Sequence, residues 1–255
     1  MALSLLNNCK PIDSSIVARW KAKVQNIMFI GHFGVGLGAK KASPAVSLGL
    51  LFLAAQFLDL LWPTFLLLGW EHVQIEPGNT IMNPLDFTDY PITHSFTMSV
   101  IWGLIVGMIY FFIKRNIRGS LVLGLAVISH WILDFIVHRP DLPLYPGSPL
   151  KVGLGLWNHM IPAILVEGLI FLVGLYFYVT TTRARDKIGG IGFWIMIGLL
   201  LLIQVSNTIG PPPPSVNAIA WAGELQWLFV LWAFWADHHR DLVTSSPDRQ
   251  PVGFS

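Results

Sequence analysis

The segment SHWILDFIVHRPD, residues 129–141, places ionisable side chains at regular steps in an otherwise apolar stretch. His130, Asp134 and His138 follow one another at intervals of four residues, and Asp141 comes three residues later. Because an α-helix turns once in about 3.6 residues, the first three side chains lie on one stripe. Imidazole and carboxylate groups are ligands for zinc and similar divalent ions. The spacing indicates a metal site, with a hydrogen-bonded His130–Asp134 pair that fixes helix packing as the alternative.

The elements that carry this segment are predicted to lie in a membrane. Of the 255 residues, 54% are hydrophobic and only 12% are charged, which is far more apolar than a soluble protein. The single cysteine, Cys9, excludes an internal disulfide and a thiolate zinc site, so His, Asp and Glu must hold any metal. The N-terminus lacks the order of features of a cleaved signal peptide, and we expect it to be retained.

Six hydrophobic runs are each about 20 residues long, enough to cross a bilayer as a helix. A shorter Gly-rich stretch at 25–39 predicts a short helix, tilted, re-entrant or on the surface, whose glycines permit close packing. We therefore predict an all-α, polytopic transmembrane helical bundle of six spans plus one short N-terminal helix, forming a single domain over residues 1–240. Residues 241–255 predict a disordered cytoplasmic tail. The six runs are 44–68, 92–113, 119–137, 159–180, 190–210 and 218–236.

The distribution of basic residues predicts the orientation, because cytoplasmic loops retain Lys and Arg. All of the 16 basic residues except Arg139 and Lys151 fall on one side if both chain ends are cytoplasmic. The loop 69–91 on the opposite side contains acidic residues and no Lys or Arg. The segment 129–141 then ends at the extracytoplasmic face.

With this orientation, several helices place costly polar groups in the outer half of the bilayer, at depths of roughly 5–13 Å or near the interface. A charged side chain at the centre of a span costs about 2.5–3.5 kcal/mol, so these groups should pair or share a cation. Taken singly, Asp59 could be a hydrogen-bond acceptor and His94 a capping residue. We assign His72, His159, His238 and His239 to loops or interfaces. The converging groups are Asp59, His94, His130, Asp134, Glu167 and Glu224.

Four motifs occur in a fixed order: GHFGVGLGAKK at 31–41, LDLLWP at 58–63, YPITHS at 90–95 and SHWILDFIVHRPDLPL at 129–144. Over residues 28–170 the chain resembles the predicted inner-membrane metal-dependent hydrolases of bacteria. That family is grouped distantly with zinc-dependent phospholipase C and zinc-dependent single-strand nucleases. The resemblance implies a bacterial inner (cytoplasmic) membrane protein with a zinc site, which the distribution of basic residues places toward the extracytoplasmic side. The metal ligands that it implies are His32, Asp59, His94, His130 and Asp134.

Two features bear on this ligand set. Relatives often have a His-Arg-Gly run before the THS motif, where this chain has Asp89, Tyr90 and Pro91, which removes one possible ligand. In addition, a tight hairpin near residues 40–44 would place His32 at a depth in the membrane nearer to that of Phe52 than to that of Asp59. We retain His32 because it lies in the first motif.

A divalent metal ion lowers the pKa of a coordinated water toward about 7, and the resulting hydroxide hydrolyses esters. Glu167 or Asp141 could accept the water's proton, and His138 could protonate the leaving group. We expect a membrane lipid as partner and a phosphoester or ester at headgroup level as substrate, which the phospholipase resemblance also implies, and no nucleic acid. The oligomeric state stays open.

Two other functions fit the same polar cluster. A proton- or ion-coupled transporter (permease) uses buried His and carboxylate groups in this way, although here they gather toward one side instead of forming a path. A non-catalytic membrane scaffold would use a closed four-ligand metal site only to tie its helices together.

Overall fold

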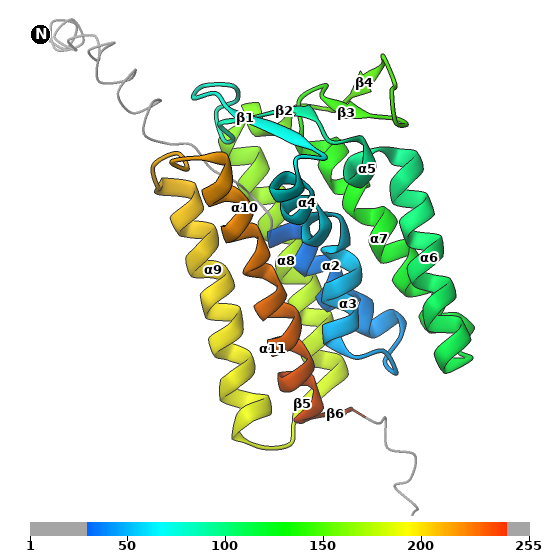
Figure 1. Cartoon of the computed structure of the whole chain (residues 1–255). Helices are drawn as coiled ribbons and strands as arrows, with labels where there is room; N and C mark the ends of the chain where they lie inside the picture. Colours follow the sequence, from blue (N-terminus) through cyan, green and yellow to red (C-terminus); the bar gives the residue numbers. More distant parts are fainter. Residues whose placement is uncertain (1–29, 244–255) are drawn as a thin grey trace, which may run out of the picture.

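The chain folds as an α-helical bundle in a computed structural model that describes residues 30–243. Three two-stranded antiparallel ladders, β1–β2, β3–β4 and β5–β6, lie at the ends of the bundle (Figure 1). The helices are α2 (Ile30–Ala42), α3 (Leu48–Ala55), α4 (Phe57–Leu68), α5 (Pro91–His94), α6 (Phe96–Lys114), α7 (Ile117–Val137), α8 (Met160–Thr181), α9 (Phe193–Ile209), α10 (Val216–Glu224) and α11 (Gln226–His238). The strands are β1 (His72–Ile75), β2 (Leu85–Asp89), β3 (Leu142–Pro143), β4 (Lys151–Val152), β5 (Thr182–Ala184) and β6 (Arg240–Leu242).

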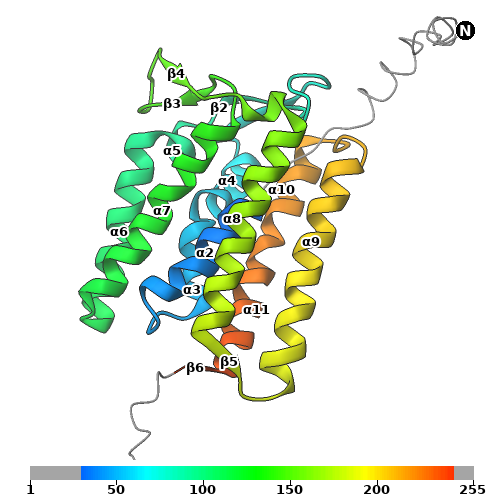
Figure 2. The same cartoon turned by 180° about the vertical axis from the view of Figure 1, so that it is seen from behind.

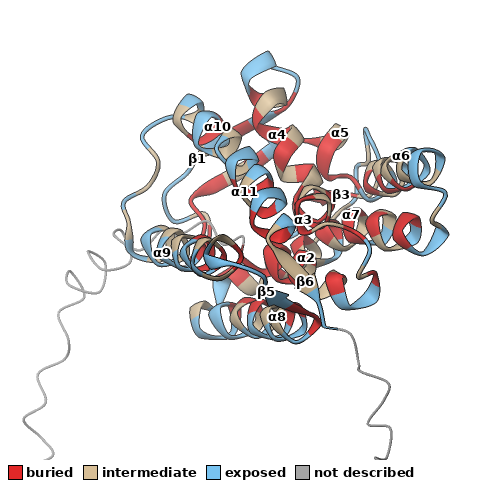
Figure 3. Ribbon diagram, turned by 90° about the horizontal axis from the view of Figure 1, so that it is seen from below, coloured by how far each residue is buried: buried red, intermediate tan, exposed pale blue. Residues whose placement is uncertain are grey.

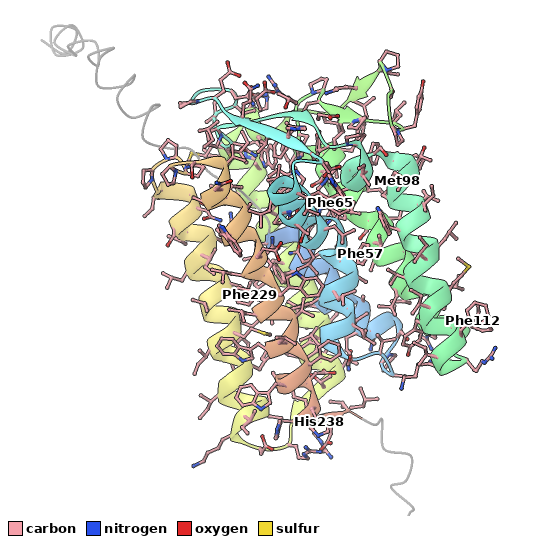
Figure 4. The ribbon with its side chains drawn as sticks, viewed as in Figure 1. Phe57, Phe65, Met98, Phe112, Phe229 and His238 are labelled. Atoms are coloured by element: carbon pink, nitrogen blue, oxygen red, sulfur yellow. The ribbon has the colours of Figure 1, made fainter. Side chains whose placement is uncertain are left out.

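The predicted all-α transmembrane architecture is confirmed. Within the described residues, five helical segments are long and apolar enough to cross a membrane: α6, α7, α8, Ile188–Ile209 and Val216–His238. The α3–α4 pair becomes the sixth if its two helices, bent by 58°, are taken as one broken span. Large apolar side chains such as Phe112 on α6 point away from the bundle (Figure 4), as expected for a surface in contact with lipid.

Helix α2 is the short Gly-rich helix, and it lies in the middle of the bundle (Figure 3). Its 13 residues, which begin at the first residue that the structure describes, reach about 20 Å, compared with about 30 Å for a hydrocarbon core. Helix α8 packs along it (Figure 2). A Cβ added to Gly174 would lie 1.9 Å from the Gly34 carbonyl oxygen, so the backbones touch where these glycines cross. The close packing predicted from the glycines is therefore present at this crossing.

We call the end of the bundle that carries β1–β4 the cap end and the end that carries β5 and β6 the tail end. Described basic residues concentrate at the tail end, whereas Arg139 and Lys151 belong to the cap end. This division is the one expected if the tail end is cytoplasmic, and the orientation itself stays a prediction. The basic residues of the tail end are Lys40, Lys41, Lys114, Arg115, Arg118, Arg183, Arg185, Lys187 and Arg240.

A buried ion pair fixes α2 at the tail end. The Lys40 ammonium lies 2.8 Å from Asp237 Oδ2, and the Tyr178 hydroxyl donates to Asp237 Oδ1 at 2.7 Å. Asp237 adjoins His238, which we assigned to a loop or interface, but the two residues have different surroundings. His238 is exposed at the tail end (Figure 4), but Asp237 turns inward to hold α2 and α8 against α11.

The predicted boundary of the C-terminal tail also needs a correction. Asp241 and Leu242, which fell inside the expected tail of 241–255, belong to β6 and pair with Arg183 and Thr182 of β5. The expected features in residues 1–29, including Cys9 and the start of the 25–39 stretch, and those in 244–255 lie outside the described residues.

Candidate metal centre

Helix α7 supplies the first two side chains of the site. His130 and Asp134 lie one turn apart on its buried face, as the spacing predicted, and His130 Nε2 is 3.4 Å from Asp134 Oδ2. The other ring nitrogen, His130 Nδ1, lies 2.8 Å from the carbonyl oxygen of Ala55. Because a carbonyl oxygen can only accept, Nδ1 carries a proton and donates it there. The Nε2 atom is left to face Asp134.

The break between α3 and α4 brings in Asp59. The helix axis turns by 58° around Gln56, and Asp59 lies in the first turn of α4 beyond the break. Its Oδ1 atom is 3.4 Å from His94 Nε2 and 3.7 Å from His130 Nε2. His94 is the last residue of α5, and Ser95 caps the following helix by accepting from the Met98 amide. This cap orders the turn that carries His94.

Four atoms form a ring in which nitrogen and oxygen alternate. The N···O separations around it are 3.4, 3.7, 3.4 and 3.7 Å. Zinc binds His and carboxylate at about 2.0–2.2 Å, so the edges of its coordination tetrahedron measure about 3.3–3.6 Å. The four N···O separations approach this range, so the side chains border one space in which a divalent ion could be held. The four atoms are Asp59 Oδ1, His94 Nε2, Asp134 Oδ2 and His130 Nε2.

Several of these atoms are buried and make no hydrogen bond. Among the described residues, His130 Nε2, Asp134 Oδ2 and both ring nitrogens of His32 have no hydrogen-bond partner, although they are almost inaccessible. The N···O contacts are also longer than the 2.7–3.2 Å of an ordinary N–H···O bond. Leaving a buried polar atom unpaired costs about 1–3 kcal/mol. The buried His and Asp groups could hold a metal ion, and a cation there would satisfy His130 Nε2 and Asp134 Oδ2.

His32 joins the site from the first turn of α2. Its Nε2 atom is 3.3 Å from Asp134 Oδ1, and its ring lies 3.9 Å from the His130 ring, centroid to centroid. The two oxygens of Asp134 therefore face different histidines. Two overlapping groups result, His32–His130–Asp134 and Asp59–His94–His130, each with ligand atoms within 4.8 Å of one another.

The predicted depth of His32 in the bundle is correct relative to Phe52 but wrong relative to Asp59. Phe33 packs against Phe52 with ring centroids 4.9 Å apart, as the hairpin predicted. A straight helix would then have carried Asp59 about 10 Å beyond this level. The bend at Gln56 turns the chain aside instead, so His32 and Asp59 border the same cluster.

Glu167, expected as a catalytic group, lies beside His32 but outside both ligand groups. It projects from α8 and accepts from the Gly31 amide at 3.4 Å. Glu167 and His32 line a small hollow with room for about one water molecule. The remaining wall of the hollow is formed by Gly31, Leu133, Ile136, Val137, Val166 and Ile170.

His138 and Asp141 form a separate pair at the cap end. His138 Nδ1 is 3.0 Å from Asp141 Oδ1, which also accepts from the Tyr90 hydroxyl at 3.1 Å. Burial, followed by the Asp141 charge, raises the pKa of Tyr90 above its usual value, so Tyr90 remains a donor. Arg139 bonds both Asp141 and Asp86. The pair lies near the ligand groups, because the Tyr90 ring is 5.2 Å from the His94 ring, but it belongs to neither of them.

The remaining polar residues lie apart. Glu224, which we expected to converge on the site, accepts instead from the Thr64 hydroxyl at 2.6 Å. His72, His159 and His238 are exposed and contribute to neither ligand group, consistent with their assignment to loops and interfaces.

Sequence reasoning missed Glu71, which it treated as one of several acidic residues in an outer loop. Its side chain is almost fully buried and accepts from the Ile92 and Thr93 amides at 2.7 and 2.8 Å. The Thr93 hydroxyl lies 2.6 Å from Glu71 Oε2 and 2.7 Å from His94 Nδ1. No local spacing links Glu71 to Thr93, because the β1–β2 hairpin separates them.

Comparison with known proteins adds no relative. No family profile, curated protein or solved structure matches the chain. The family resemblance drawn from the four motifs therefore stays a prediction.

Proposed function

We propose that the protein is a membrane-embedded metal-dependent hydrolase that cleaves a phosphoester or ester bond of a lipid at headgroup level, with zinc as its ion. The observation that carries the proposal is the alternating ring of His and Asp atoms, whose N···O separations of 3.4–3.7 Å are close to the edge lengths of a zinc tetrahedron. Asp59, His94, His130 and Asp134 would hold the ion, with His32 beside them on Asp134. A zinc ion there would polarise the bond to be cleaved and lower the pKa of a coordinated water to about 7.

The surrounding residues supply groups that can move protons. Glu167 borders a hollow of the size of one water molecule beside His32, where it could accept a proton from an attacking water. His138, one turn beyond Asp134 and bonded to Asp141, could donate a proton to the leaving group. Two such groups beside the cluster suit hydrolysis better than simple ion storage.

The position of the site supports a lipid substrate. Asp134 lies in the last turn of α7, and His94 lies two residues before the start of α6, so the cluster is close to one boundary of the spanning helices. The Asp59 side chain is 24% exposed, whereas those of His32, His94, His130 and Asp134 are at most 7% exposed. Asp59 therefore marks the accessible edge, where a headgroup could approach.

The arrangement supports a transporter less well. Among the described residues, buried ionisable groups gather at the cap-end cluster and at the Lys40–Asp237 pair. Between these two places α2 and α3 present apolar side chains, including Phe33, Leu37 and Phe52. A proton or ion would find no continuous polar path along them.

The test uses the purified chain in lipid nanodiscs that contain headgroup-labelled phospholipids. We expect headgroup release that requires added zinc, stops with a chelator, and falls at least 100-fold in the His130→Ala, Asp134→Ala double variant. Glu224→Gln, which changes a carboxylate outside both ligand groups, should retain release. Bound metal without turnover on any lipid class would overturn the enzyme and favour a structural metal. Ion flux through vesicles without hydrolysis would favour the transporter.

A further inference from the structure

A buried chain of hydrogen bonds runs from Glu71 through Thr93 to His94. Glu71 and Thr93 are 1% and 0% exposed, so water does not compete for these bonds. The Thr93 hydroxyl oxygen lies between Glu71 Oε2, at 2.6 Å, and His94 Nδ1, at 2.7 Å. On the far side of its ring, His94 Nε2 faces the carboxylates of Asp59 and Asp134.

The chemistry of these groups fixes the direction of each bond. The Thr93 hydroxyl donates its single proton to Glu71 Oε2. The Thr93 oxygen must then accept from His94, which places a proton on Nδ1. In a neutral imidazole this leaves the lone pair on Nε2, the atom that faces Asp59 and Asp134. His130 has the same arrangement, imposed by the Ala55 carbonyl.

We infer that Glu71 and Thr93 are positioning residues that hold His94 in the metal-binding tautomer, with Nε2 directed at the ion. The inference rests on the proposed metal site. Residues that bond the second nitrogen of a ligating His fix its ring and tautomer, and their loss weakens metal binding by about 10- to 100-fold. Glu71 precedes Ile92 by 21 positions, so this support comes from a different part of the chain from the ligand.

The two oxygens of Glu71 separate a structural role from the positioning role. Oε1 accepts from the Ile92 and Thr93 amides and so caps the short helix α5. Oε2 bonds only the Thr93 hydroxyl among the described contacts. Thr93→Val therefore removes the link to His94 and leaves the cap in place, in a side chain of nearly the same shape.

Glu71→Gln gives a sharper test, because it reverses the chain of bonds. With the amide oxygen kept on the two backbone N–H groups, the amide NH2 would donate to Thr93. The Thr93 hydroxyl would then be free to donate to His94 Nδ1, which drives the His94 proton onto Nε2. The variant has the size of the native residue but disfavours the tautomer that binds metal.

The experiment measures Zn²⁺ affinity by competition with a chromogenic chelator and the visible spectrum of the Co²⁺-loaded protein. We expect Thr93→Val and Glu71→Gln to bind Zn²⁺ about 10- to 100-fold more weakly, with a shifted Co²⁺ spectrum. Thr93→Ser restores the hydroxyl and should remain within about twofold of the native protein. So should Thr97→Val, a matched change in a threonine that bonds the Leu144 carbonyl and no histidine.

The outcomes separate the two proposals. If the native chain binds zinc and both Thr93→Val and Glu71→Gln match its affinity and spectrum, the positioning role is overturned while the metal site stands. If Thr93→Ser weakens binding as much as Thr93→Val, the hydroxyl is not the operative group and the inference fails. If the native chain binds no zinc, the metal site and the inference fall together. A Thr93→Val chain that does not fold is replaced by the comparison of Glu71→Gln with Thr93→Ser.

Discussion

At the scale of single residues, a defect in a helix does two things for the candidate site. In an uninterrupted helix the Ala55 carbonyl would accept from the amide four residues later, which is that of Asp59. Here the carbonyl accepts from His130 instead, and the helical bonds resume with the Leu60 amide and the Gln56 carbonyl at 2.8 Å. The break thus frees the Ala55 carbonyl to orient His130, and it also turns Asp59 toward His130.

Glu167 allows a prediction at this scale. If it accepts a proton from the attacking water, Glu167→Gln should leave metal binding intact and lower lipid turnover about 100-fold or more, the usual contribution of general base catalysis. Headgroup release and bound zinc are measured on the same sample, with Glu224→Gln as the matched control. Undiminished turnover would remove Glu167 from the mechanism, and loss of zinc would make it a ligand.

At the scale of secondary structure elements, α2 is the unusual part. Its described residues are fewer than a membrane span needs, yet it lies in the middle of the bundle, where it packs against α3, α7 and α8 and carries His32 to Asp134. The crossing of Gly34 and Gly174 lets α8 approach closely enough to support it. At its other end, the Lys40–Asp237 pair prevents the helix from sliding.

The α2–α8 crossing predicts the effects of two glycine substitutions in the same helix. A Cβ at Gly174 meets the Gly34 backbone, whereas a Cβ at Gly168 meets nothing within 4 Å. Gly174→Ala should therefore destabilise the protein by about 1–3 kcal/mol and weaken metal binding by displacing His32. Gly168→Ala should be neutral or slightly stabilising. Unfolding in detergent measures both variants, and equal stabilities would show that the crossing is not tightly packed in solution.

The element scale also shows what the sequence can predict. The length and apolar composition of the hydrophobic runs are enough to predict the spanning helices. The 3.6-residue period of the helix is enough to predict that His130 and Asp134 lie on one face. The bend at Gln56 could not be predicted from the local sequence, because no Gly or Pro occupies the break and Pro63 lies well inside α4. The local sequence also does not predict contacts between residues far apart in the chain, such as Glu71 with Thr93 or Lys40 with Asp237.

At the scale of the whole molecule, the two ends differ in charge and in content. The cap end holds the candidate metal centre beneath the β1–β2 and β3–β4 hairpins, and the tail end holds most of the described basic residues. If Lys and Arg remain in the cytoplasm, the site opens toward the extracytoplasmic side. A hydrolase with this orientation would act on lipids of the outer leaflet.

Labelling with a membrane-impermeant maleimide tests this orientation in intact bacteria. In a Cys9→Ser background, Leu150→Cys between β3 and β4 should react from outside, whereas Lys187→Cys near β5 should react only after lysis. Both positions are exposed, so accessibility differs only through the membrane. The reverse pattern would place the site on the cytoplasmic side.

The central claim is that the His and Asp side chains hold one shared divalent ion, and elemental analysis of the purified chain tests it most directly. The native protein and Glu224→Gln should carry stoichiometric zinc, or a similar divalent metal, after purification with the metal present. Asp134→Asn, which alters the carboxylate that faces all three histidines, should lose at least nine-tenths of it. A native chain without metal, or an Asp134→Asn chain that retains it in full, would contradict the account.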